Sequence, residues 1–416
     1  MPDDNDSIEN VLIMQGGGSL GAFGCGVFKA LRKNKIKLNI LAGTSIGGVN
    51  AALMAGSKEE DHPERALEQF WLEIAENSVK LNSPIAEWLG VNNTTMTYPF
   101  FFPLTAAANV SSNTNTQHNL QFKSLFSFYS SAIYGNDKMF VPRWRPDYSL
   151  TDPQYFTPWK WTYLYDHSPL LKTLEKYIDY NKIQPNAKYN SPRLIITAVN
   201  VLTAEPLTFD SSEIKITPRH LLATSGYPLY GFPWVEVEEG VYAWDGSLLS
   251  NTPLREVIDA APVTDKQIFL VENYPKNIDN LPQNLPEVFH RARDIMFSDK
   301  TSHNVKMSKV ITQYLRYIEE LYNIFQDHVD PDKLDKEVVN KIERKYKKIK
   351  EDHGAEIKSV HYITREEKHP HMYENADFSI KTIKESIKDG ELKTNEIIKN
   401  IRKWLKNILA REFNTC

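Results

Sequence analysis

The pattern of apolar positions predicts short buried strands that alternate with helices over the first 275 residues. Consecutive apolar residues are typical of buried strands, whereas apolar residues three or four positions apart mark one face of a helix. Strands are therefore expected at residues 11–15, from residue 40, and at 192–200, 205–210, 241–244 and 267–271. Helices are expected at residues 22–31, 49–54, 63–76 and 171–180, with shorter helical segments at 219–228 and from 251.

Beyond about residue 285 the strand patterns stop, and charged helical segments continue to the C-terminus. A basic amphipathic helix can lie on an anionic membrane, or its apolar stripe can pack on the rest of the protein. For the last segment we favour packing on the protein. Its stripe consists of Ile397, Ile398, Ile401, Trp404, Leu405, Ile408 and Leu409.

Residues 80–165 have a different composition, rich in Phe, Tyr, Trp, Pro, Asn and Ser, and they show little periodicity. A long irregular insertion in a compact domain is usually a lid, a binding loop or a disordered segment. Two interpretations stay open, namely a satellite apolar cluster and an aromatic wall that lines an apolar substrate channel.

Two glycine-rich turns each join a predicted strand to a predicted helix. Residues 43–47 (Gly-Thr-Ser-Ile-Gly) fit the nucleophile elbow, in which a serine lies on a sharp turn at the start of a helix. Residues 16–21 match the dinucleotide fingerprint and can present backbone N–H groups to an anion. A dinucleotide site, however, needs an acidic residue at the end of the second strand, where this chain has Ser45.

Asp245 stands at the end of the predicted strand 241–244 and is followed by Gly246 and Ser247. A serine hydroxyl is a poor nucleophile unless a base accepts its proton. Asp245 could take the proton of Ser45 and later return it to the leaving group. The N–H groups of residues 16–18 (Gly16, Gly17 and Gly18) would then hold the oxyanion of an acyl-transfer intermediate.

The glycine loop, the elbow and the late aspartate, in this order, resemble the patatin-like phospholipase family over residues 8–275. The resemblance implies an α/β fold, a three-layer α/β/α arrangement with a mainly parallel central sheet. It also implies calcium-independent hydrolysis of lipid esters by a Ser45–Asp245 dyad, with no cofactor and no metal. Gly21, Gly43, Gly47 and Gly246 would support these motifs. We expect an acyl hydrolase domain at 1–284 and a helical C-terminal extension at 285–416.

The sequence departs from the family pattern in the glycine loop and after the aspartate. Leu20 occupies a position where many members carry Arg or Lys, and Ser247 replaces a Gly or Ala. An alternative enzyme is a Ser-His-Asp esterase that uses His290 or His303, although the elbow follows only two strands here. A non-catalytic module that binds lipid or phosphate is a further alternative. His369 and His371 lack the spacing of a zinc motif on a helix.

Composition excludes several other classes of protein. The net charge of -4 and the pI near 6.3 give no footprint for nucleic-acid binding. Two cysteines, Cys25 and Cys416, do not form a disulfide scaffold and suit a reducing compartment. The acidic N-terminus lacks the pattern of a signal peptide, and no apolar run is long enough for a transmembrane helix. We expect a cytoplasmic protein with a lipid or membrane-surface substrate; peripheral membrane binding and a homo-oligomer stay open.

Overall fold

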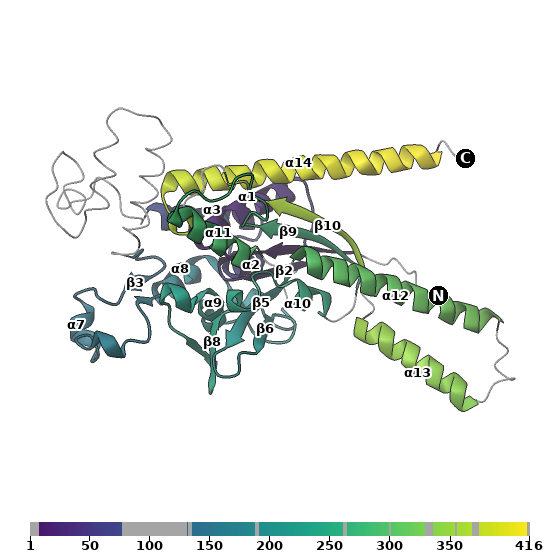
Figure 1. Ribbon diagram of the computed structural model, residues 1–416, viewed down its shortest axis with the longest axis horizontal. Coiled ribbons are helices and arrows are strands. Elements are labelled where there is room, and N and C mark those ends of the chain that lie inside the picture. Colours follow the sequence, from purple (N-terminus) through teal and green to yellow (C-terminus); the bar gives the residue numbers. More distant parts are fainter. Residues whose placement is uncertain are drawn as a thin grey trace.

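A computed structural model describes residues 8–76, 131, 135–187, 191–260, 264–298, 301–328, 336–353, 356–367 and 374–413. Its centre is an eight-stranded sheet in the order β10-β9-β1-β2-β5-β8-β7, with β6 paired to β5 (Figure 1). The strands of this sheet are β1 (Glu9–Met14), β2 (Ile40–Thr44), β5 (Arg193–Asn200), β6 (Pro206–Asp210), β7 (Val235–Glu238), β8 (Val241–Asp245), β9 (Lys266–Glu272) and β10 (Ile357–Thr364). A separate hairpin consists of β3 (Val141–Pro142) and β4 (Tyr165–Asp166).

The pairs β10–β9, β9–β1, β1–β2 and β2–β5 are parallel, whereas β6, β7 and β8 join by antiparallel pairs. Helices cover both faces of this mainly parallel sheet, as the sequence predicted. The helices are α1 (Ala22–Lys33), α2 (Ile46–Ala55), α3 (Pro63–Glu76), α7 (Tyr148–Thr151), α8 (Pro169–Tyr177), α9 (Pro218–Ser225), α10 (Leu254–Ile258), α11 (Leu285–Phe297), α12 (Thr301–His328), α13 (Lys336–His353) and α14 (Ile380–Phe413).

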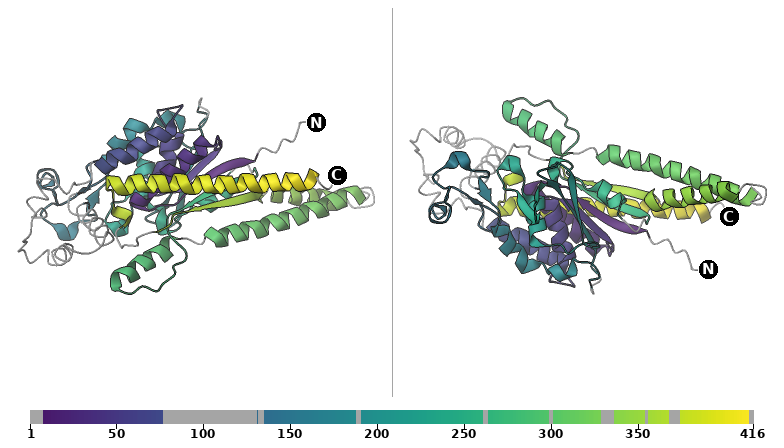
Figure 2. Two further views of the ribbon diagram at one scale, coloured as in Figure 1. Left: turned by 90° about the horizontal axis from the view of Figure 1, so that it is seen from above. Right: turned by 90° about the horizontal axis from the view of Figure 1, so that it is seen from below.

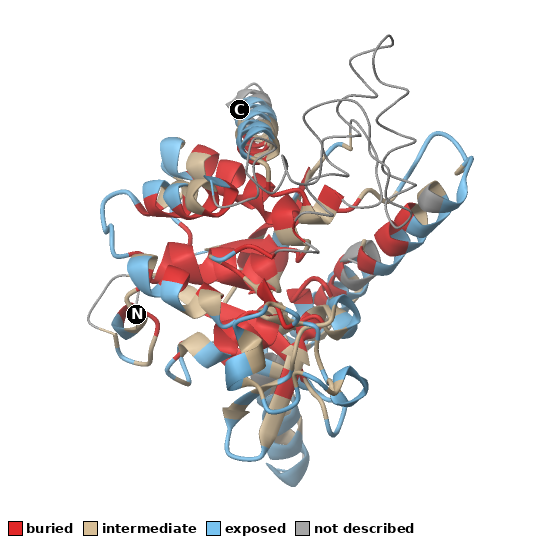
Figure 3. Ribbon diagram, turned by 90° about the vertical axis from the view of Figure 1, so that its left-hand side faces the viewer, coloured by how far each residue is buried: buried red, intermediate tan, exposed pale blue. Residues whose placement is uncertain are grey.

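The alternation of side chains along each strand divides the core into two layers. Leu12 and Met14 of β1 pack in one cluster with α1, α2, α3, α8, α9 and α14. Val11 and Ile13 of the same strand face a second cluster that includes residues of α10 and α12. The buried residues therefore concentrate in the sheet and on the inner faces of the helices (Figure 3).

The geometry of the site depends on how β2 and β8 share one edge of β5. Thr197 of β5 pairs with Thr44 of β2 and with Thr208 of β6, so β2 and β6 lie on opposite edges. Ala198 pairs with Leu207 of β6 and with Asp245 of β8, so β8 lies on the same edge as β2. Since β2 is parallel and β8 antiparallel to β5, their carboxyl ends meet. This register brings Ser45 and Asp245 together.

The C-terminal region is not wholly helical, which corrects the expectation that strands end before residue 285. The strand β10 extends the sheet by parallel pairing with β9. Its residues alternate between the two faces at the sheet's edge, where one face is partly exposed, and this weakens the apolar pattern of the segment. The strand β7 is likewise a short, half-exposed addition that the pattern did not predict. The expected boundary at 284/285 stays a prediction.

The long helix α14 packs along α1 at very close range, as Figures 1 and 2 show. A Cβ at Gly26 would lie 1.8 Å from the Ile387 carbonyl oxygen, and one at Gly390 would lie 2.2 Å from the Phe23 oxygen. Glycine at both positions allows the two backbones to touch. Part of the predicted apolar stripe packs on the domain, because Ile398 is buried and Ile397 and Ile401 contact the core.

Farther along the stripe, Trp404 is exposed. The side chains of Leu405, Ile408 and Leu409 lie outside the described part of the chain. Among the described residues, no helix has both the length and the apolar character needed to cross a membrane.

Candidate active site

Ser45 occupies a strained turn between β2 and α2. Its φ of 57° and ψ of -132° are unusual for a residue with a side chain. The backbone N–H of Ser45 donates to Thr224 Oγ1 at 3.0 Å, and that hydroxyl donates to the Thr197 carbonyl at 2.7 Å. Thr224 thus ties the turn to β5 and helps to hold the strained conformation.

Glycine is required around this turn because backbone segments approach each other. A Cβ at Gly43 would lie 2.3 Å from the Gly47 carbonyl carbon, and a Cβ at Gly47 would lie 2.3 Å from the Met14 oxygen. A Cβ at Gly246 would lie 2.7 Å from Thr197 Oγ1, and one at Gly21 would lie 2.8 Å from Ile46 Cγ2. The structure therefore gives each of the four glycines a packing reason.

Asp245 is buried at the end of β8. Its Oδ1 accepts a hydrogen bond from the Ser247 N–H at 2.8 Å. Its Oδ2 is buried and forms no hydrogen bond of ordinary geometry with the described residues. Burial raises the pKa of Asp245 to about 6, against the lowering effect of the Ser247 N–H and the Ser45 and Ser247 hydroxyls. The carboxylate is therefore a stronger base than an exposed aspartate.

The three glycines after β1 have different environments. The Gly16 N–H donates to Asn251 Oδ1 at 3.0 Å, and Gly16 lies so close to the elbow that a Cβ there would be 2.7 Å from Ser45 Cβ. Gly17 and Gly18 have φ values of +148° and +58°, which favour glycine. Within the described chain, the N–H groups of Gly17 and Gly18 donate no hydrogen bond. Those two groups are available to an anion.

Asn273 fixes the orientation of this loop. Its Nδ2 donates to the Gln15 carbonyl at 3.1 Å and to the Gly16 carbonyl at 3.0 Å. The Gly16 carbonyl and the Gly17 N–H belong to one planar trans peptide and point in opposite directions. Asn273 therefore directs the Gly17 N–H away from itself. No sequence pattern pointed to Asn273, which directly follows β9.

A cavity of about 590 Å³ opens above Ser45, Asp245, Gly17 and Gly18. Most of its lining is apolar or aromatic. Part of the lining comes from the described end of the 80–165 insertion, namely Met139, Phe140, Leu164 and Tyr165, and both interpretations of the insertion stay predictions. Residues 80–130 and 132–134 of this region lie outside the described residues.

The C-terminal region completes the cavity. Asn375, Ala376 and Phe378 line it, and so do Phe289, Arg293, Met296 and Phe297 of α11. The turn Glu374–Ala376 lies directly on the glycine loop, because the Ser19 hydroxyl donates to the Glu374 carbonyl at 2.7 Å. A Cβ at Gly18 would lie 2.2 Å from the Asn375 oxygen. Residues far from both motifs thus shape the space above them.

Leu20, at the position of a family Arg or Lys, is buried against Tyr227, Tyr274 and Phe297. A cation reaches the same cavity from elsewhere, since Arg293 of α11 lines it and lies 5.4 Å from the Tyr274 ring centre. No sequence pattern singled out Arg293 for this position.

Of the two histidines proposed for a Ser-His-Asp triad, His290 does not line the cavity. His290 Nε2 lies 2.7 Å from Glu367 Oε1 and 3.3 Å from Asp294 Oδ2, and no histidine is among the described residues that line the cavity. The side chain of His303 lies outside the described part of the chain, as do His369 and His371. Cys25 is buried in the core, where burial raises its pKa.

Comparison with known proteins supports one family. Residues 12–258 match the model described as Patatin-like phospholipase. The comparison with curated proteins gives no match. Among solved structures, VipD from Legionella pneumophila is 13% identical with a TM-score of 0.35, over 94% of this chain and 67% of VipD.

The type III effector ExoU is 8% identical with a TM-score of 0.27, over 94% of this chain and 53% of ExoU. The ExoU–SpcU complex from Pseudomonas aeruginosa gives 14% identity and a TM-score of 0.27, over 72% and 51%. The chain therefore spans about two thirds of VipD and about half of ExoU.

Proposed function

Because the chain belongs to the patatin-like phospholipase family, we propose that it hydrolyses carboxylic ester bonds of lipids with Ser45 as nucleophile and Asp245 as base. The observation that carries this proposal is the meeting of β2 and β8 on one edge of β5. That register puts a serine on a strained turn beside a buried carboxylate at the floor of an apolar cavity. No histidine is needed for this chemistry, because the carboxylate can act as the base itself.

The proposed reaction uses Asp245 twice. As Ser45 Oγ attacks the ester carbonyl carbon, its proton passes to Asp245, and a tetrahedral oxyanion forms. When the ester C–O bond breaks, Asp245 gives that proton to the departing alcohol. A water molecule then attacks the acyl-serine, loses a proton to Asp245 and releases the fatty acid, and the proton returns to Ser45.

The N–H groups of Gly17 and Gly18 are the proposed donors to the oxyanion. Both residues line the cavity next to Ser45. The Gly16 N–H is already engaged by Asn251, so Gly16 contributes by its close approach to the elbow. Such donors stabilise charge that develops in the transition state and reduce the barrier without moving.

The cavity favours a substrate with a long apolar part. Its volume of about 590 Å³ lies within the range of ordinary ligand sites, and its lining offers aromatic and aliphatic contacts to an acyl chain. Arg293 adds a cation to this lining, where its guanidinium also pairs with Asp294 and Glu374. We therefore propose a phospholipid or lysophospholipid as the substrate class.

The first experiment combines covalent labelling with two substrates. A fluorophosphonate probe is expected to form an adduct on Ser45, located by peptide mass spectrometry, and Ser45→Ala is expected to remain unlabelled. Wild-type protein is expected to release fatty acid from phosphatidylcholine vesicles in the presence of a calcium chelator, and to cleave a p-nitrophenyl ester. Cleavage of the simple ester alone would refute the phospholipid assignment. Absence of both labelling and turnover would favour a non-catalytic lipid-binding module.

Asn273→Ala is expected to lower kcat by roughly ten- to a hundredfold with a nearly unchanged KM, because the Gly17 N–H loses its fixed direction. Steady-state kinetics on the p-nitrophenyl ester measure both constants. Asn34→Ala is the matched control, since Asn34 also donates to a backbone carbonyl but lies at the end of α1. An equal loss in both variants, or a change confined to KM, would contradict this role for Asn273.

A further inference from the structure

The helix α11 has its charged face toward the protein and its apolar face toward solvent, the reverse of an ordinary surface helix. His290, Arg293, Asp294 and Phe297 are buried. The opposite face consists of Leu285, Val288, Phe289, Ala292, Ile295 and Met296, all exposed, which we call the outer stripe. These positions follow helical spacing and form one continuous face.

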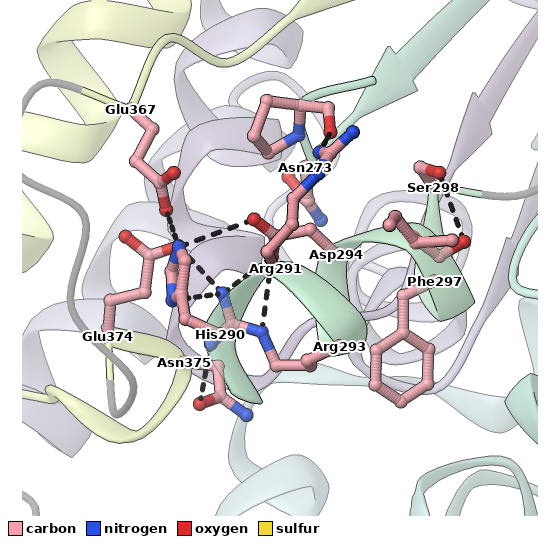
Figure 4. A network of polar contacts seen from close by, with 12 residues as sticks. Asn273, His290, Arg291, Arg293, Asp294, Phe297, Ser298, Glu367, Glu374 and Asn375 are labelled. Carbon is pink, nitrogen blue, oxygen red and sulfur yellow. Dashed lines mark hydrogen bonds and ion pairs between the residues drawn. The ribbon is translucent and has the colours of Figure 1, made fainter. Parts of the chain in front are cut away.

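A buried polar network fixes this orientation (Figure 4). Arg293 pairs with Asp294 at 2.7 Å and with Glu374 at 3.3 Å, and His290 pairs with Glu367 at 2.7 Å. Arg365 in turn binds Glu374 at 2.6 Å. Rotation of the helix to bury the outer stripe would move Arg293 and His290 away from their partners. The carboxylates would then be buried without a compensating charge, which is strongly unfavourable.

A second anchor acts at the side of the helix. Arg291 donates to the carbonyl oxygens of Pro275 and Lys276 at 3.0 and 2.6 Å. The Asn284 side chain caps the first turn by accepting from the Glu287 N–H at 3.0 Å. The helix and the loop before it project from the body of the domain (Figure 2). The outer stripe is therefore held outward by the buried network and by the contacts of Arg291.

The outer stripe is continuous with the cavity above Ser45. Phe289 and Met296 belong to the stripe and also line the cavity, and each is more than half exposed. Leu229 and Tyr230, on the turn Pro228–Tyr230, likewise line the cavity and are exposed. Exposed apolar patches of this kind mark contact with a protein or a membrane.

We propose that the outer stripe of α11 docks the protein on a lipid surface, so that the cavity opens directly into the lipid. This inference rests on the proposed function, because a protein partner on the same side chains would close the route by which a lipid ester enters. The stripe would insert among the acyl chains at the level of the head groups, as interfacial amphipathic helices do. Phe289 and Met296 would then form a continuous apolar path from the lipid to Ser45.

The test uses stripe residues that do not line the cavity. Binding to neutral phosphatidylcholine vesicles is measured by flotation in the Ser45→Ala background, where no turnover disturbs the vesicles. The double variant Val288→Asp/Ile295→Asp is expected to bind vesicles about tenfold more weakly or worse, because two apolar side chains no longer enter the lipid. Val338→Asp, at an exposed valine of α13, is the matched control and is expected to bind normally.

A second measurement separates this inference from the proposed function. With Ser45 intact, the double variant is expected to cleave a soluble p-nitrophenyl ester at the wild-type rate and vesicle phospholipid far more slowly. Equal vesicle binding by the double variant and the control would overturn the inference, even if the protein is an esterase. A change from dimer to monomer in the double variant would also overturn it, since a second copy would then cover the stripe. Vesicle binding without any hydrolysis would support docking and refute the proposed enzyme.

Discussion

Asp245→Asn is expected to lower kcat/KM for ester hydrolysis by about 10³–10⁴-fold, as large a loss as Ser45→Ala causes. The substitution keeps an oxygen that can accept the Ser247 N–H bond but removes the base that takes the Ser45 proton. Initial rates with a soluble p-nitrophenyl ester give kcat/KM for both variants. Because the two groups act as a unit, the double variant is expected to be no slower than either single variant.

The Ser45–Asp245 dyad would be refuted if a histidine, and not Asp245, proved to be the base. An Asp245→Asn protein that retains activity, together with a histidine variant that loses it, would return the assignment to a Ser-His-Asp site. Circular dichroism of each variant is the control for folding. If Ser45→Ala is folded and inactive while Asp245→Asn stays active, Ser45 is still supported as the nucleophile, but Asp245 is not its base.

Asp245→Asn is also expected to change the pH dependence of kcat/KM. Asp245 must be ionised to act as base, so wild-type kcat/KM is expected to fall as pH drops below about 6, where the carboxylate becomes protonated. Residual activity of Asp245→Asn should lack this limb of the pH profile. Rate measurements between about pH 4 and pH 8, roughly two pH units either side of the pKa, resolve the difference.

The thermal stability of Asp245→Asn is expected to rise although its activity falls. Because burial raises the pKa of Asp245 from 3.8 to about 6, the folded state binds its proton more tightly than the unfolded state. The stability of the wild type therefore decreases as pH rises through this window, by roughly 3 kcal/mol in total at neutral pH. Asp245→Asn removes the penalty, so the variant should unfold at a higher temperature at pH 7 to 8. The gain should shrink below about pH 4, which thermal melts can measure.

Gly47→Ala is expected to destabilise the protein by about 3 kcal/mol or more, or to prevent folding. The added methyl would meet the Met14 carbonyl at 2.3 Å and the Gln15 carbonyl at 2.7 Å. Both oxygens belong to the backbone of β1 and the start of the glycine loop, so no side chain can move aside. The elbow and the loop would have to separate, and esterase activity should fall with stability. Urea unfolding followed by circular dichroism measures the free energy of unfolding.

The adjacent glycine provides the matched control. In Gly48→Ala the nearest atom is the Gly43 oxygen at 3.1 Å, and the next two contacts are side-chain methyl groups at 3.2 and 3.3 Å. Small shifts relieve these contacts, and alanine favours the helix over glycine by about 1 kcal/mol. Gly48→Ala should therefore cost far less stability. Similar losses in both variants would contradict the prediction, because the close approach of Gly47 to β1 would then not decide the effect.

The sequence by itself determined the parts of the site that local chemistry specifies. The elbow around Ser45 and the loop at residues 16–18 were predictable because positive φ values and close backbone contacts require glycine over a few adjacent positions. The strands β1, β2, β5 and β9 were predictable because both of their faces are buried and their residues are continuously apolar. These patterns also allowed the family to be predicted, which the match over residues 12–258 confirms.

Only the tertiary structure decided which distant residues meet these motifs. The sequence does not predict that β2 and β8 pair with the same edge of β5 and meet end to end. Such pairing depends on the register between segments about 200 residues apart. Asn273 and the turn at residues 374–376 reach the glycine loop from outside the motifs, through contacts that have no local sequence pattern. The outer stripe of α11 is also a feature that only the tertiary structure decides. The apolar spacing of α11 predicts a helix but not the direction in which the apolar face points. That direction is fixed by the contacts of the helix with Glu367 and Glu374, which are distant in the sequence.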